Sequence, residues 1–143
     1  MQFVTPQSKL FDLAAKSILE DAKTYSLDKT FLKKHLKCAV HGRYSKEEDL
    51  ICLLNYLIIY NVKGWSIATA GKSTVCIEFV FVYPEHDYQN WFEMMTQKLS
   101  NKNNLRLVTR EEKVVRAAHA AGFKLQGVED KKLCFERVLG DKN

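Results

Sequence analysis

Two side chains stand where proton-transfer chemistry could occur. Glu78 interrupts the otherwise apolar run from Thr74 to Tyr83, and a carboxylate in such a run must be paired or lie in a solvated cleft. A carboxylate in a cleft is a candidate general base, and the alternative is an ion pair between Glu78 and a Lys or Arg on a neighbouring strand. His119 is a candidate proton donor, and the alternative is a place on the exposed face of a helix.

A strand-to-helix turn follows the apolar run. Pro84 ends the run, and Asp87 precedes a segment with helical periodicity. Turns of this kind can bind phosphate through main-chain N–H groups at the helix N-terminus. This turn has no glycine, and Asp87 stands where a phosphate would arrive. Its carboxylate suits an N-cap and the helix dipole, so the residue types predict a capped helix start.

The cysteine spacing argues against a metal site. No Cys-x-x-Cys pair occurs, so neither a zinc site nor a redox dithiol is predicted, and we expect no metal. The cysteines are widely separated and mostly lie in apolar runs: Cys38, Cys52, Cys76 and Cys134. We expect buried, reduced thiols and an intracellular, cytoplasmic location.

The chain has a net charge of +5, and much of the excess lies in one short region. The basic residues of this patch are Lys29, Lys33, Lys34, Lys37 and Arg43. Such a patch can contact nucleic acid or an acidic partner, and the alternative is a solvated helix face. No apolar stretch approaches the ~20 residues of a membrane helix, so we expect no membrane span.

Hydrophobic periodicity predicts an alternation of helices and strands in one domain over 1–143. Helices are expected over 7–23, from an N-cap at Ser26 to about residue 42, over 88–99, and from a capping box of Thr109 and Glu112 to Gly122. Strands are expected over 1–5, 53–60, 65–70, 74–83, 105–109, 123–126 and 133–139, with a turn over 127–130. The segment 50–60 is ambiguous, because a capping box at 45–48 favours a helix and its composition favours a strand.

This order of elements resembles the acyl-CoA-dependent N-acetyltransferases of the GNAT superfamily. Two segments carry the resemblance, which is best over 65–139. Phe79-Val-Phe-Val-Tyr-Pro84-Glu85 is similar to the family's hydrophobic strand followed by x-Pro-Glu. Ala117-Ala-His-Ala-Ala-Gly122-Phe123 is similar to its helix end with Gly-Phe. The resemblance implies an α/β (α+β) fold with a mixed, mostly antiparallel sheet, helices on both faces, and acetyl-CoA as cofactor if the chain is active.

The resemblance also implies a cofactor site that this chain has altered. Its residues would be Val80, Val82, Asp87, Tyr88, Gln89 and Asn90. The family builds its pyrophosphate loop from an Arg or Gln followed by Gly-x-Gly or Gly-x-Ala, and here Asp87, Tyr88 and Asn90 occupy those positions. A carboxylate replaces a cation, and side chains replace both glycines. The resemblance further implies Glu78 as the base that deprotonates an amine. The family often has a Tyr that protonates the leaving thiolate, and here Ala118 occupies that position beside His119.

Three functions remain open from the sequence. The first is a GNAT-fold protein with altered or lost acetyl-CoA binding that acts as a binding or structural module, with a protein partner or self-assembly. The resemblance extends to virion proteins of tailed phages, which would place the chain in a virion. The second is an active acyl-CoA-dependent N-acyltransferase with Glu78 as general base. The third is a nucleic-acid-associated protein that uses the basic patch.

Overall fold

The computed structural model describes residues 1–5, 8–33, 36, 56–71, 74–99 and 104–138. The fold divides into two compact units, one formed by Met1–Gln2 with Ile59–Asn143 and the other by Phe3–Ile58. The expectation of a single domain stays a prediction. In the described part of the chain, no helix combines the length and apolar character needed to cross a membrane.

Seven strands form one sheet in the order β1-β2-β3-β4-β5-β7-β6. Their bounds are Gln2–Val4 (β1), Tyr56–Asn61 (β2), Gly64–Ala70 (β3), Thr74–Val82 (β4), Asn104–Thr109 (β5), Lys124–Glu129 (β6) and Lys132–Arg137 (β7). β4 runs parallel to β5, whereas β3–β4, β5–β7 and β6–β7 are antiparallel. The predicted mixed, mostly antiparallel sheet is confirmed.

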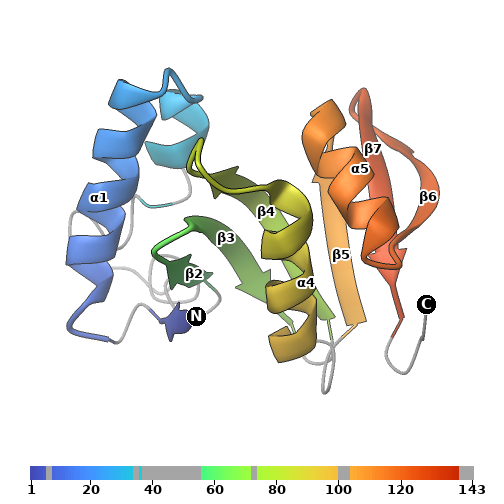
Figure 1. Ribbon diagram of the computed structural model, residues 1–143, viewed down its shortest axis with the longest axis horizontal. Coiled ribbons are helices and arrows are strands. Elements are labelled where there is room, and N and C mark those ends of the chain that lie inside the picture. Colours follow the sequence, from blue (N-terminus) through green and yellow to red (C-terminus); the bar gives the residue numbers. More distant parts are fainter. Residues whose placement is uncertain (6–7, 34–35, 37–55, 72–73, 100–103, 139–143) are drawn as a thin grey trace, which may run out of the picture. The chain divides into compact units, whose positions relative to one another are not determined.

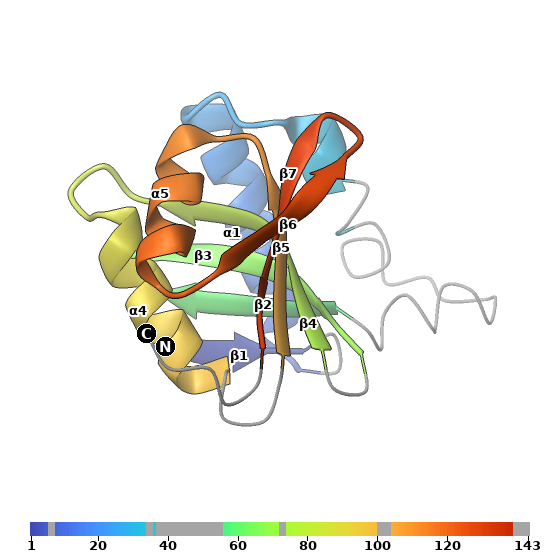
Figure 2. The same ribbon diagram turned by 90° about the vertical axis from the view of Figure 1, so that its right-hand side faces the viewer.

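In the larger unit, two helices lie side by side against one face of the sheet (Figures 1 and 2). They are α4 (Tyr88–Leu99) and α5 (Glu112–Ala120). The Phe92 ring of α4 meets the Phe123 ring edge-on, with the ring centroids 5.9 Å apart. Such a pair buries a large apolar area and also has favourable aromatic geometry. The two helices therefore share one core, which α4 also forms with β3 and β4.

On the other face of the sheet in this unit, Trp65 packs on two phenylalanines of β4. The centroid of Trp65 lies 5.6 Å from Phe79 and 5.4 Å from Phe81. The core of this unit contains the buried side chains of Trp65, Trp91, Phe81 and Phe92, whereas Phe79 is half-buried.

The smaller unit contains α1 (Phe11–Thr24), which buries Phe11, Ala15, Ile18 and Ala22 along one stripe. Ser26 is not the cap of the next helix, because it adopts a positive φ of 55°. Asp28 takes that role by accepting a hydrogen bond from the Phe31 amide at 3.0 Å. Residues 29–33 are helical, and the expected end of this helix lies outside the described residues.

The ambiguous segment is a strand where it is described. β2 begins at Tyr56, so the preference for a strand over 56–60 is confirmed. Residues 50–55 and the capping box proposed at 45–48 lie outside the described residues.

The C-terminal half contains two corrections and one confirmed cap. Thr109 accepts a hydrogen bond from the Glu111 amide at 3.2 Å, so it forms a turn before α5 and no capping box. The β6–β7 turn was expected over 127–130, but residues 127–129 belong to β6 and the turn lies at Asp130 and Lys131, both with positive φ. Gly122 ends α5 with φ 90°, while the amide of Phe123 reaches the carbonyl of Ala118 at 3.0 Å. This is a Schellman arrangement, and it ends the helix at the glycine where the sequence predicted its end.

Candidate functional site

The candidate site begins where β4 parts from β5. The parallel ladder ends at the pair Ile77–Leu107, although β4 continues to Val82 and β5 to Thr109. On its other side, β4 has a bulge at Glu78, because Ile67 pairs with Phe79 and Ala68 pairs with Ile77. Bulges of this kind re-aim side chains and are common next to active sites. Glu78 therefore sits at the point where the strands diverge.

Glu78 is bound to neutral groups. Its Oε1 accepts a hydrogen bond from the Thr69 hydroxyl at 3.1 Å. The Cys76 thiol also donates a hydrogen bond to this carboxylate. Burial, and next the charge of Glu78, raise the pKa of Cys76 to about 12. Within the described ranges, the ion pairs are Arg106–Glu129 and Arg116–Glu112, so the alternative of a Lys or Arg partner for Glu78 is not found there.

The start of α4 is capped by its own chain. The Asp87 Oδ1 accepts a hydrogen bond from the Asn90 amide at 2.6 Å. The preceding turn is closed by the His86 amide, which donates to the carbonyl of Tyr83 at 2.9 Å. The N-cap role predicted for Asp87 is therefore confirmed. An anion at this helix end would have to compete with the Asp87 carboxylate for the Asn90 amide and would also be repelled by its charge.

Tyr88 reaches from α4 to the end of β4. The Tyr83 amide donates to the carbonyl of Lys63 at 2.9 Å, so it points toward β3. Because amides alternate along a strand, the Val82 amide points to the side on which β5 has diverged. The Tyr88 hydroxyl accepts a hydrogen bond from this main-chain group. The pKa of Tyr88 is raised, first by burial and then by the nearby carboxylate of Glu111 at the start of α5.

One cation lies at the start of α4. Lys63, in the turn between β2 and β3, donates its Nζ to the Oδ1 of Asn90 at 3.0 Å. Its own amide is held by Asn61 Oδ1 at 3.2 Å. Sequence reasoning missed Lys63, because nothing in a linear pattern brings a hairpin turn beside a helix that begins 25 residues later. The residue types of Asn61-Val-Lys-Gly64 predict a turn, but they do not predict which helix lies beside it.

The other predicted site residues lie at separate places. Val80 is buried and pairs with Ser66, which faces α4. Gln89 is exposed and donates to Glu93 at 3.4 Å along the helix. His119 is exposed in the last turn of α5, where its role as proton donor stays a prediction.

Of the basic patch, Lys29 and Lys33 are exposed and one helical turn apart. Lys34, Lys37 and Arg43 lie outside the described residues. The patch stays a prediction. The described ranges contain no group of three or more His, Cys, Asp or Glu side chains that could hold a metal ion, and Cys76 and Cys134 form no disulfide there.

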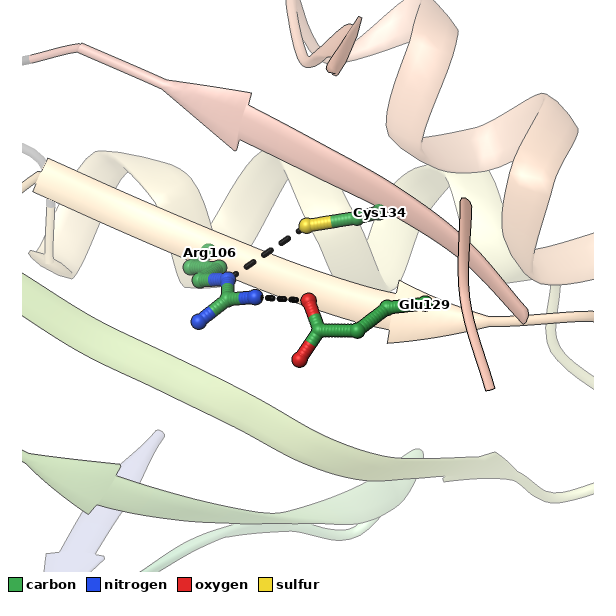
Figure 3. Close-up of polar contacts among 3 residues, drawn as sticks. All are labelled: Arg106, Glu129 and Cys134. Atoms are coloured by element: carbon green, nitrogen blue, oxygen red, sulfur yellow. Dashed lines mark hydrogen bonds and ion pairs between the residues drawn. The ribbon is translucent and has the colours of Figure 1, made fainter. Parts of the chain in front are cut away.

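A second polar cluster lies on the sheet (Figure 3). Arg106 of β5 donates its Nε to the Sγ of Cys134 at 3.4 Å and forms an ion pair with Glu129. The register places Arg106 beside both Cys76 and Glu136. Sequence reasoning missed this cluster, because its members come from strands that are adjacent in the sheet but not in the chain.

Comparisons with known proteins place the fold. No family model matches the chain, and no curated protein matches it. A solved structure described as "a probable acetyltransferase" has a TM-score of 0.50 at 13% identity, covering 89% of this chain and 92% of that one. The PaiA N-acetyltransferase from Thermoplasma acidophilum, in complex with coenzyme A, has a TM-score of 0.49 at 14% identity, covering 96% and 99%. The chain has the GNAT-like fold.

Proposed function

We propose that this chain is a GNAT-fold protein with altered or lost acetyl-CoA binding, which acts as a binding or structural module. The observation that carries the proposal is the start of α4. The Asp87 carboxylate accepts the hydrogen bond of the Asn90 amide, and the Tyr88 hydroxyl accepts that of the Val82 amide. A pyrophosphate needs amides at the helix end, and an acyl carrier arm needs the space and amides beside β4. These residues do not fit coenzyme A.

The Tyr88 contact supports the proposal more strongly than the charge of Asp87 does. A surface charge can be screened by salt or offset by a nearby cation such as Lys63. A half-buried tyrosine that is hydrogen-bonded to the Val82 amide must instead give up this contact before a ligand can use the amide. The module proposed here could be structural, for example in a phage virion, or could bind a protein partner.

Calorimetric titration of coenzyme A tests the proposal. We expect no binding up to millimolar ligand. Tyr88→Gly combined with Asp87→Gly releases both amides, so this double variant should gain at least about tenfold in affinity. Gln89→Gly is the matched control, because it places a glycine in the same helical turn but releases neither amide. Micromolar binding by the unaltered chain would overturn the proposal.

One observation favours a second function, an active acyl-CoA-dependent N-acyltransferase. Glu78 lies at the divergence of β4 and β5 without an ion-pair partner among the described residues, and Lys63 supplies a cation beside α4. A carboxylate in that place can accept a proton from an amine. This function requires micromolar binding of acetyl-CoA and release of free CoA in the presence of amines. Release should be lost in Glu78→Gln and kept in Glu93→Gln, an exposed glutamate of α4.

A further inference from the structure

The strand β6 forms an open edge of the sheet. Among the described strands its one neighbour is β7 (Figure 2). All six of its residues are exposed. An edge strand presents main-chain donors and acceptors that can pair with another strand. The side chains decide which strand fits.

A bulge gives β6 an apolar face. Leu125 pairs with Phe135, and Val128 pairs with Leu133. Since residues two apart on β7 share a face, Leu125 and Val128 share that face as well. In a regular strand, residues three apart would lie on opposite faces, so the irregularity between Leu125 and Gly127 brings them together. Both are strongly exposed, Leu125 at 58% and Val128 at 72%.

The opposite face of β6 carries two charges of opposite sign. Lys124 pairs with Glu136, and Glu129 pairs with Lys132, so both lie on the face that holds Arg106. Figure 3 shows Glu129 beside Arg106. The strand thus reads, from one end to the other, cation, apolar, polar, glycine, apolar, anion. If a second β6 lies antiparallel to this strand, apolar residues meet apolar residues on one face, and opposite charges meet on the other.

We propose that β6 pairs antiparallel with β6 of a second copy of this chain, around a two-fold axis between Gln126 and Gly127. In this register Leu125 lies opposite Val128 of the partner subunit, and Lys124 lies opposite Glu129 of the partner subunit. The axis repeats each pair, which gives two apolar pairs on one face and two ion pairs on the other. The two sheets join into one, and Glu129 stays within reach of Arg106.

Complementarity on both faces favours a second copy over an unrelated strand. An arbitrary strand would match the apolar face or the charged face, whereas an antiparallel copy matches both. A strand of six residues spans about 20 Å, so this contact is shorter than a standard interface and should give a reversible, concentration-dependent dimer.

Sedimentation equilibrium of the full chain over a concentration series tests the proposal. We expect a monomer–dimer equilibrium whose dissociation constant rises at least about tenfold in Val128→Lys, since each dimer loses two apolar pairs. Val62→Lys is the matched control, because Val62 is 82% exposed in the turn between β2 and β3 and should leave the equilibrium unchanged.

A charge-swap experiment tests the register. Lys124→Glu alone places carboxylates opposite each other, and Glu129→Lys alone places cations opposite each other, so each variant should be monomeric. A mixture of the two should form a heterodimer, because every charge pair is then opposite in sign. Misfolding cannot produce this recovery. A chain that stays monomeric at millimolar concentration would overturn the proposal, as would a dimer that Val128→Lys leaves intact or a mixture that stays monomeric.

Discussion

The indole Nε1 of Trp91 donates a hydrogen bond to the Ser66 hydroxyl at 2.9 Å, and both residues are fully buried. This bond joins α4 to β3 inside the core. It also fixes which face of β3 meets the helix, because Trp65 and Ile67 alternate with Ser66 and point to the other face. The helix that begins the candidate site is therefore held to the sheet by a polar contact as well as by packing.

Ser66→Ala should lower the free energy of unfolding by about 1–3 kcal/mol, because the indole N–H would then be buried without an acceptor. Urea denaturation measures this change. Trp91→Phe removes the donor instead and also opens space in the core. The double variant should lose less unfolding free energy than the two single variants lose together, because the hydrogen bond can be lost only once. Simple additivity would show that the bond contributes nothing to stability.

Gly64 is required by close backbone packing between β3 and β4. A Cβ at this position would lie 2.3 Å from the carbonyl oxygen of Phe81 and 2.9 Å from the Cα of Val82. Gly64→Ala should therefore cost at least about 2 kcal/mol of unfolding free energy, because main chain must shift. Gly127→Ala is the control, since nothing lies within 4 Å of its Cβ, and it should change stability by about 0.5 kcal/mol or less. Equal costs at both glycines would contradict this interpretation.

The elements that the sequence predicted best are those with strong local signals. β4 and α4 lie within one residue of their predicted bounds, because an apolar run, Pro84 and a capping Asp87 all specify the same boundary. Ser26 and Thr109 were wrong as caps, since several residues at each helix start can cap and packing decides among them. The β6–β7 turn was predicted over 127–130, but β6 continues to Glu129, and the positive φ values fall at Asp130 and Lys131.

The candidate site was predictable in its residues but not in its contacts. Glu78 and Asp87 are conspicuous in the sequence, one as a carboxylate in an apolar run and the other at a helix start. Their partners Thr69 and Cys76, the contact of Tyr88 with Val82, and the place of Lys63 all depend on strand register and on a bulge. Hydrophobic periodicity predicts neither the register nor the bulge, because it shows which face of the sheet a side chain lies on but not which residue lies beside it.

The Cys76 thiol should be unreactive in the folded chain. Its pKa is raised from the ordinary thiol value of 9.0 to about 12, so the folded chain keeps the thiol protonated between pH 9 and pH 12, where an unfolded chain has lost the proton. Iodoacetamide labelling of Cys76, followed by mass spectrometry, should therefore be slow when the chain is folded and fast in urea. The same difference predicts that the stability contributed by this thiol is fully present below pH 9 and is lost as the pH rises from 9 toward 12.

Glu78→Gln should speed the labelling of Cys76, because the charge of Glu78 is the second cause of the raised pKa. Burial is the larger cause and remains, so the pKa should fall but stay above 9. Glu93→Gln, at an exposed position on α4, is the control and should not alter the rate. An unchanged rate in Glu78→Gln would show that the carboxylate does not act on this thiol.

Asp87 stabilises α4 at the helix end where a cofactor phosphate would otherwise bind. Asp87→Ala should lower the free energy of unfolding by about 0.5–2 kcal/mol, because the Asn90 amide loses its acceptor and the helix dipole loses a favourable charge. Asp87→Asn should cost less, since an amide oxygen also caps. Glu85→Ala, an exposed residue in the same turn, is the control for thermal or urea denaturation. If Asp87→Ala were as neutral as Glu85→Ala, the capping bond would not explain an aspartate at this position.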